Sequence, residues 1–467
     1  MVREIIKKEI IQNILTLKFL ILSLLLLLIF PFSIHLGYKN YKDNLKDLQR
    51  AKTVFQEDVK SKKTWREIAD SEYRIVVPSH RLQILVRGIT NSIGRTVSFE
   101  LGKDIDIKDS EYDSNPFLSI FGSFDLEFIF KVFLSLFAIV FSYDSISGEK
   151  ESGMLKQILS NSISRASLII GKIVGGYITL AIPILISLMV SFIYLLFLKI
   201  NFDMEDTLRI ILALFIGFLY LLVFYAVGIL VSSFTHRGSI SLLILLMIWV
   251  IVIFFIPNLS KEMGSFLYSV KSPSEIAIEK DKQRKEIMDR IRDYYFNWRE
   301  AHPGKDVGEI TENAYKKAVE EITKAFSKIN DEWNRKRIAQ INFITYLSRL
   351  SFASCFSFSL MNILDVGFER YVNITNSIIK YRDDYYEFLR KKVAQEEVDR
   401  VRAELGLAER KKPNVNFNEF PNYEGYFQKS DFLLSIKKSY FDILLLSLYL
   451  LIFLLIAYFK FLRYDVR

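Results

Sequence analysis

Residues 143–165, YDSISGEKESGMLKQILSNSISR, form a short polar segment between two long apolar runs. The segment is punctuated by glycine and carries charges of both signs, at Asp144, Glu149, Lys150, Glu151 and Lys156. Apolar residues then recur at helical spacing, at Met154, Leu155, Ile158 and Leu159. Ser147 is a candidate N-cap, which would place Glu149 and Glu151 in the first turn, where the helix dipole favours negative charge. We expect a short amphipathic helix at a membrane face, suited to a groove on a soluble partner. An ordinary charged connection with a capped helix is the alternative.

The same segment has a longer ordered pattern: Asp144, Ile146, Ser147, Gly148, Glu149, Lys150, Glu151, Gly153 and Leu155, followed by Leu159, Ser160, Ser164, Arg165, Gly171 and Lys172. This pattern resembles the loop between the second and third spans of ABC-2 family transporter permeases. In that family the loop carries the coupling helix, which docks into an ATPase subunit. The resemblance implies ATPase-coupling roles for Asp144, Ile146, Ser147, Gly148, Glu149, Lys150, Glu151, Gly153, Met154, Leu155 and Lys156. Two positions depart from the family pattern, Met154 in place of Thr and Ser162 in place of Pro.

Other parts of the chain resemble the same family. Phe124, Asp125, Leu126 and Phe128 are similar to its entry motif before the second span. The ending at residues 461–467, FLRYDVR, is similar to that of permeases related to the nitrous-oxide-reductase maturation transporter. Together with residues 347–351, LSRLS, these features point to a subgroup with large extracytoplasmic insertions.

The composition indicates a chain divided between apolar spans and polar domains. Its 467 residues are 51% hydrophobic and 25% charged, and the charged share is too high for a protein that lies wholly in a membrane. The formal net charge is +9, but lysine and arginine alternate with aspartate and glutamate through the polar regions, as on solvated helix faces. We therefore expect no nucleic-acid partner. A single cysteine, Cys355, excludes an intrachain disulfide and any CxxC site.

Hydropathy and periodicity predict a mainly α-helical polytopic membrane protein. The resemblance implies that its architecture is that of the ABC-2, or type V exporter-like, class. Six spans are expected at residues 17–36, 124–142, 169–198, 207–234, 239–257 and 440–461. A basic amphipathic helix at residues 1–16 is suited to lying in the membrane interface. The loop occupies residues 143–168, and the chain ends in a tail at residues 462–467.

Two polar regions separate the spans. Residues 37–123 are predicted to form a small mixed α/β domain, with a helix over 41–69 and strands at 73–77, 82–86 and 95–101. Residues 258–438 are predicted to form a larger helical domain. Apolar residues recur at helical spacing around 287–298 and 310–333, and residues 369–410, rich in lysine, arginine, aspartate and glutamate, suggest a third helix. Within it, residues 352–364 are apolar but too short to cross a membrane, so they should lie at the membrane surface or inside the domain.

Flanking charges predict the orientation of the chain. Arginine and lysine flank the spans on the side that holds both termini and residues 143–168, whereas the opposite turn carries Asp203, Glu205 and Asp206. By the positive-inside rule, both termini and the loop are cytoplasmic, and both polar regions lie outside the cytoplasm. The expected location is the cytoplasmic (inner) membrane.

The sequence contains no GxxxxGK[ST] phosphate loop, no GxSxG nucleophile elbow and no zinc motif. We therefore expect a non-enzymatic chain with no cofactor of its own. The resemblance implies a permease subunit of an exporter, whose partner ATPase, in two copies, would bind ATP and magnesium. The remaining expected partners are the bilayer, a second permease chain, identical or related, and a candidate periplasmic protein. The alternatives are a mechanotransmitting subunit that acts on that periplasmic protein, and a membrane scaffold or receptor. The transported substrate is left open.

Overall fold

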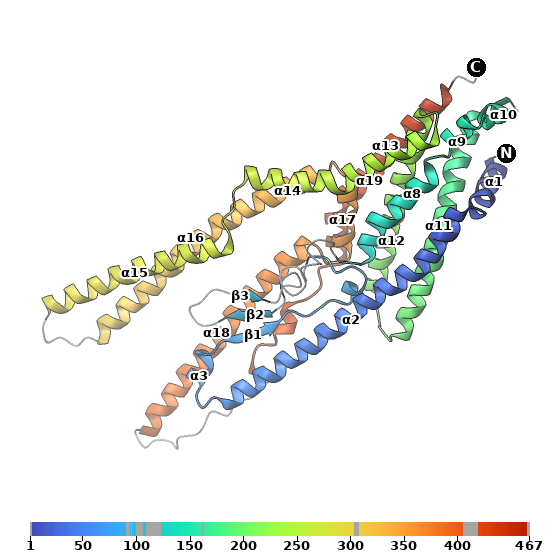
Figure 1. The fold of residues 1–467 in the computed structure, drawn as a ribbon. Helices are drawn as coiled ribbons and strands as arrows, with labels where there is room; N and C mark the ends of the chain where they lie inside the picture. Colours follow the sequence, from blue (N-terminus) through green and yellow to red (C-terminus); the bar gives the residue numbers. More distant parts are fainter. Residues whose placement is uncertain are drawn as a thin grey trace. The chain divides into compact units, whose positions relative to one another are not determined.

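The computed structural model describes residues 2–89, 94, 96–99, 106–108, 123–160, 163–302, 308–404 and 419–464. Over these residues the chain is mainly helical, as the sequence predicts (Figure 1). Six of the described helical segments are long and apolar enough to cross a membrane: Leu17–Ser61, Leu126–Glu151, Arg165–Phe197, Met204–Phe234, Gly238–Leu267 and Phe432–Leu462. The expected six spans are therefore confirmed by length and composition.

The chain forms two compact units. The first consists of Met1–Val250 and Phe352–Arg467, and the second of Ile251–Ser351. This grouping differs from the predicted single domain at residues 258–438, because the apolar segment that follows Ser351 is buried among the spans of the first unit.

The first unit begins with α1 (Val2–Ile14) and α2 (Leu17–Ser61). α2 continues for 45 residues, far past the predicted end of the first span at residue 36. At 1.5 Å per residue it is roughly 67 Å long, about twice the thickness of a bilayer's hydrocarbon core. Gly37 allows this helix to lie against a neighbouring segment, since a Cβ at that position would be 2.0 Å from the carbonyl oxygen of Ile84.

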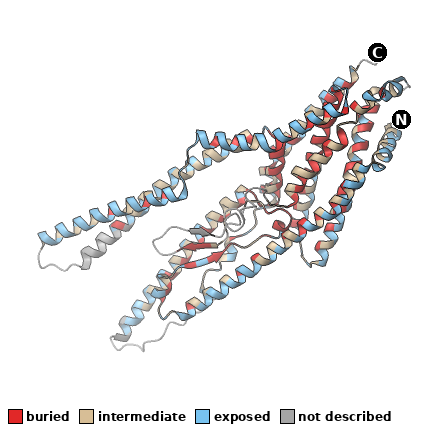
Figure 2. Ribbon diagram, viewed as in Figure 1, coloured by how far each residue is buried: buried red, intermediate tan, exposed pale blue. Residues whose placement is uncertain are grey.

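Three further spans follow in the first unit. The second is built from α7 (Leu126–Phe128), a π-helical turn η2 (Ile129–Leu134) and α8 (Ser135–Ser142). The third is α11 (Arg165–Phe197) and the fourth is α12 (Met204–Phe234). α12 is the most buried of these, and Figure 2 shows its buried residues along much of its length.

The fifth span starts with α13 (Gly238–Val250) in the first unit and continues as η3 (Ile251–Phe255) and α14 (Ile256–Leu267) in the second. The helix does not end at Pro257, where the span was predicted to end, because helical structure continues through this proline directly after the π-helical turn η3. The rest of the second unit is a pair of long helices, α15 (Pro273–Ala301) and α16 (Gly308–Ser348). A capping box formed by Ser272 and Glu275 starts α15.

The short apolar helix α17 (Phe352–Ile363) returns to the first unit. It packs against α12 and against the sixth span, α19 (Phe432–Leu462). Most of its residues are buried, including Cys355 at 0% exposure, and Phe356 stacks on Tyr220 of α12 with ring centroids 4.3 Å apart. α17 therefore lies inside the helical bundle, which satisfies its backbone internally despite its short length.

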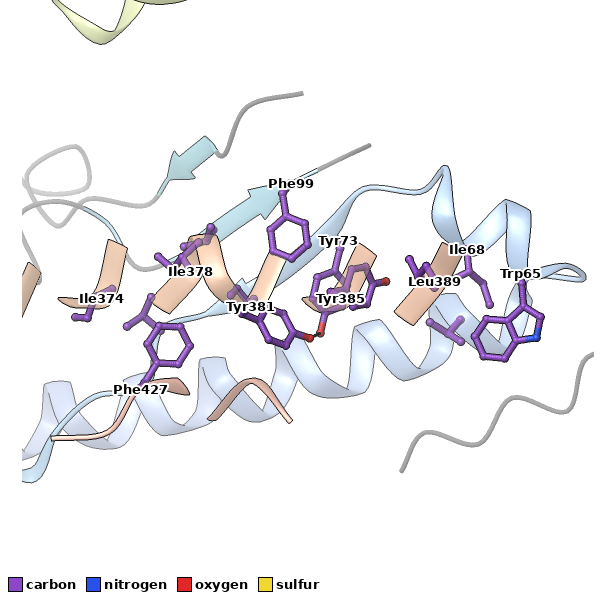
Figure 3. Close-up of a cluster of buried hydrophobic side chains, with 14 residues drawn as sticks. Trp65, Ile68, Tyr73, Phe99, Ile374, Ile378, Tyr381, Tyr385, Leu389 and Phe427 are labelled. Atoms are coloured by element: carbon purple, nitrogen blue, oxygen red, sulfur yellow. Dashed lines mark hydrogen bonds between the residues drawn. The ribbon is translucent and has the colours of Figure 1, made fainter. Parts of the chain in front are cut away.

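An aromatic core joins polar segments from both ends of the sequence (Figure 3). The earlier part supplies the end of α2, α3 (Trp65–Ala69) and an antiparallel sheet of β1 (Tyr73–Val76), β2 (Thr96–Phe99) and β3 (Asp106–Lys108), in that order. The later part supplies α18 (Phe368–Glu404) and η5 (Tyr423–Tyr426). The two predicted polar domains thus share a hydrophobic core, which we call the aromatic core: Val59, Trp65, Ile68, Tyr73, Ile75, Val77, Val97, Phe99, Ile374, Ile378, Tyr381, Tyr385, Leu389 and Phe427.

Three local predictions in these segments need correction or completion. The expected strand at 82–86 is the 3-10 helix η1 (Arg81–Ile84), because the His80 side chain accepts the N–H of Leu82 and starts a turn. The expected helix over 41–69 is interrupted between α2 and α3, where Thr64 caps the new helix. Residues 405–410 of the helix predicted over 369–410 lie outside the described residues, as do parts of the strand predicted at 95–101.

Candidate functional site

The loop predicted to contain one amphipathic helix contains two. α9 (Ser147–Glu151) and α10 (Met154–Ser160) are separated by Ser152 and Gly153. Gly153 has a φ of +73°, a conformation that residues with a Cβ rarely adopt. Glu149, Lys150 and Glu151 thus lie on α9, whereas the apolar stripe lies on α10, so the two groups of side chains can point in different directions.

The start of α9 is capped by a different helix. The prediction that Ser147 is the N-cap is wrong: the N-cap is Ile146, and the Ser147 hydroxyl donates to the carbonyl of Tyr143 at 2.8 Å. The Oγ of Ser232, on α12, instead accepts the N–H groups of Ile146 at 3.0 Å and Ser147 at 2.9 Å. Ile146 and Ser147 are fully buried, so these bonds satisfy donors that water cannot reach.

Asp144 ties the loop to the first span. The Lys18 ammonium, near the start of α2, lies 2.7 Å from the Asp144 carboxylate and 4.5 Å from the centre of the Tyr143 ring. Both charged side chains are about one-third exposed, so solvent screens this pair and its contribution to stability is small. Its geometric effect remains, since it joins α2 to the end of the second span.

Lys150 and Glu151 tie α9 to the fourth and fifth spans. The Lys150 ammonium donates to the carbonyls of Ser233, at 2.5 Å, and Thr235, at 3.0 Å, where α12 ends. The Glu151 carboxylate accepts the N–H of Gly238 at 3.0 Å, at the first residue of α13. Each contact follows the helix dipole, because a cation meets a helix C-terminus and an anion meets a helix N-terminus.

Glu149 ties α9 to the third span and to α1. Lys172 of α11 has its Nζ 2.7 Å from an oxygen of Glu149 and 2.7 Å from an oxygen of Glu9. Lys172 is only 2% exposed, and both carboxylates are mostly buried. The predicted interfacial helix α1 is therefore packed along α11, and this three-residue network joins it to the loop.

The predicted coupling residues divide by exposure. Ile146, Ser147 and Leu155 are fully buried, and Asp144, Gly148, Glu149 and Lys150 are partly buried. Glu151, Gly153, Met154 and Lys156 are exposed, with 44% of Met154 accessible. α9 is thus the anchored part of the loop, and α10 presents the free surface, held through Leu155.

The first and last described helices, α1 and α19, each have an end beside this loop (Figure 1). The Arg165 guanidinium at the start of α11 donates to the carbonyl of Leu462 at the end of α19. The Tyr464 ring centre lies 5.0 Å from the Lys150 ammonium. Ser162 and residues 465–467, which belong to the segments with family resemblance, lie outside the described residues.

A second buried polar cluster lies where α12 begins. Arg209 is fully buried and donates to Glu205 and to the carbonyl of Ile363, each at 2.7 Å. Next to it, Asp206 accepts from Lys429 at 2.6 Å. These bonds join α12 to α17 and to the segment before α19, and the sequence showed no sign of them.

His80 lies at the edge of the second cluster. Its Nε2 is 3.9 Å from Asp206, and its Nδ1 accepts a backbone N–H, so the ring is held neutral. Burial, with the Lys429 cation nearby, lowers the pKa of His80 to about 3; Asp365 opposes this shift, and the guanidinium groups of Arg370 and Arg209 favour it.

The described residues contain no group of three or more histidine, cysteine, aspartate or glutamate side chains placed to hold a metal ion. In the loop, α9 and the residues before it are linked to five neighbouring helices, whereas α10 is left accessible.

No curated protein matches the sequence. The family model for ABC-2 family transporter proteins matches residues 3–466, which is almost the whole chain. This family comprises the membrane components of ABC transporters, which are not themselves ATPases. The chain therefore belongs to the ABC-2 family of transporter proteins.

Proposed function

We propose that this chain is a permease subunit that couples ATP hydrolysis by a separate ABC ATPase to export, or extraction, across the cytoplasmic membrane. The proposed coupling element is the pair α9 and α10, with α10 seated in a groove of the ATPase. One observation supports this most directly: four charged side chains of one short segment bond to different helices, while the adjoining helix stays exposed.

This arrangement suits the transmission of force. A force applied to α10 would be transmitted to α9 through Ser152 and Gly153. α9 and the residues before it are linked to α1, α2, α11, α12 and α13. Movement of the ATPase would therefore displace several spans together, as rigid bodies. ATP can drive such a change only if the ATPase binds the two conformations of the permease differently.

The orientation and assembly are part of the same proposal. Basic residues around the loop and termini favour a cytoplasmic location for that end of the bundle. The aromatic core would then lie outside the cytoplasm. This would place the chain in the subgroup of permeases with large extracytoplasmic insertions. We propose an assembly with two ATPase copies, which bind ATP and magnesium, and a second permease chain.

The test is extraction of the native protein in mild detergent, followed by identification of the chains that co-purify. We expect an ABC ATPase to co-purify with the native chain. Its recovery should fall when Met154 and Lys156, both exposed on α10, are replaced together by aspartate. A matched control places aspartate at Val54, which is 64% exposed on α2 and remote from the loop. The absence of an ABC ATPase among the chains that co-purify with the native protein would contradict the proposal.

A second candidate is the transmission of movement to a periplasmic partner without transport. It is favoured by the continuity of α2, which is bonded to the loop at Lys18 and enters the aromatic core at Val59. Vesicle assays separate the two functions. ATP-dependent movement of the aromatic core without flux of any substrate would favour transmission, and substrate-dependent flux would favour transport.

A further inference from the structure

Lys172 is the most deeply buried charged residue in contact with the loop. At 2% exposure, its ammonium has lost nearly all contact with water, a loss that is costly unless ionic partners replace it. Glu9 and Glu149 are those partners, and the three residues come from α1, α9 and α11. A lysine that merely balanced charge would need only one of them.

α11 is shaped to hold α1 at this point. A Cβ on Gly171 would lie 2.6 Å from a methyl carbon of Ile5, and a Cβ on Gly175 would lie 2.8 Å from the Cβ of Glu9. Any larger residue at either position would push α1 away from α11. The two glycines and Lys172 occupy neighbouring positions on the same helix, so close packing and ion pairing act on the same segment of α1.

We propose that Lys172 is a positioning residue that holds α1 and α9 together on α11, so that α1 moves with the coupling loop. α1 then becomes a second element through which the ATPase acts on the third span. This inference rests on the proposed function for its consequence in coupling. The clamp itself is a statement about the permease alone.

The charge balance makes the clamp depend on the lysine. Both carboxylate oxygens lie 2.7 Å from the same ammonium, so its removal leaves two buried carboxylates facing each other. The second oxygen of Glu149 is buried and has no hydrogen-bond partner among the described residues. Loss of the ammonium should therefore release at least one of the two helices.

The experiment compares Lys172→Met with Lys172→Arg, and uses Lys18→Met as the matched control. Lys18 also pairs with the loop, but that pair is partly exposed. Each variant carries Ile5→Cys, and Cys355 is fully buried, so a maleimide reports the release of α1. The second readout is the ratio of ATP-driven activity to ATP hydrolysis in the complex with its ATPase.

Ile5 is partly exposed in α1. For Lys172→Met we expect maleimide labelling of the thiol introduced by Ile5→Cys to rise severalfold above this partial level and the coupling ratio to fall, with the ATPase still co-purifying. Lys172→Arg should preserve both values, because it keeps the charge, and Lys18→Met should leave the labelling unchanged. If Lys172→Met does not insert, Glu9→Gln replaces it. A smaller rise in labelling is then expected, because α1 loses its ion pair while Lys172 keeps Glu149. Unchanged labelling in the variant tested would overturn the clamp, as would equal labelling of the Lys18→Met control. If the native chain binds no ATPase, the proposed function fails, while labelling still decides the clamp.

Discussion

Replacing Gly153 with alanine tests whether the bend between α9 and α10 matters. The residue has a φ of +73°, and a Cβ built on it has no atom within 4 Å. The added methyl group therefore meets no neighbour, and its cost comes from the backbone alone, about 1–2 kcal/mol for an L-residue in this conformation. The reduced entropy of the unfolded chain offsets part of this, which leaves about 1 kcal/mol.

A net cost of about 1 kcal/mol lowers the equilibrium constant between the native bend and the other conformations of this turn by roughly fivefold. If α10 binds the ATPase in this bend, the affinity for the ATPase should fall by up to the same factor, measured by titration of the detergent-solubilised permease. Gly148→Ala is the matched control, because Gly148 lies in α9, is free of positive φ and leaves its Cβ 3.4 Å from the nearest atom. Alanine favours a helix over glycine, so Gly148→Ala should bind normally. Normal binding by Gly153→Ala, or an equal loss in both variants, would refute the reasoning.

Three further predictions concern the rest of the first unit. Because the pKa of His80 is lowered in the folded chain, the unfolded chain takes up a proton below about pH 6.5 that the folded chain does not. The free energy of unfolding should therefore drop by up to about 2 kcal/mol at pH 5. The melting temperature of the native protein should fall more between pH 7 and pH 5 than that of His80→Asn. Tyr73 and Tyr381 share a buried hydrogen bond of 2.9 Å, so either single change to phenylalanine should cost about 1–3 kcal/mol, whereas the double change should cost less than the sum of the single changes in a double-mutant cycle. Gly37→Ala would place a Cβ 2.0 Å from the carbonyl oxygen of Ile84 and should lower the melting temperature, since a backbone atom has little room to yield; an unchanged melting temperature would contradict this packing.

The site could be located from sequence because its charges and glycines are consecutive in the chain. Its anchors could not, since they depend on contacts between distant residues. Lys172 lies 163 positions from Glu9 and 23 from Glu149, and Ser232 lies 85 positions from Ser147. A serine within a hydrophobic span has no local pattern that marks it as the cap of another helix.

The spans could be predicted because long apolar runs are unambiguous, whereas their ends could not. Residues 37–61 are polar, yet they continue the helical period of the first span, so composition placed a boundary where the backbone has none. The same kind of error occurred at Pro257, because helical structure continues through a proline, a residue that usually ends a helix. Local residue chemistry allows both outcomes at each position, and tertiary packing selects one.

The packing of the two polar regions around one core also could not be predicted from local sequence patterns. α18 has the charged pattern of a solvated helix, yet Tyr381 and Tyr385 on one face pack against Tyr73 and Phe99, which precede them by about three hundred positions. Periodicity shows that such a face exists, and it leaves open which segment covers it. The structure supplies that pairing.

The central claim is that α10 contacts a nucleotide-hydrolysing partner. A photo-crosslinking residue in place of Met154, which is 44% exposed, tests it in the native membrane, with Val54 as the control position. The account predicts a crosslink from position 154 to an ABC ATPase, and none from position 54. Crosslinking of the ATPase from position 54 alone, or labelling of position 154 by a reagent confined to the outside of the cell, would contradict it.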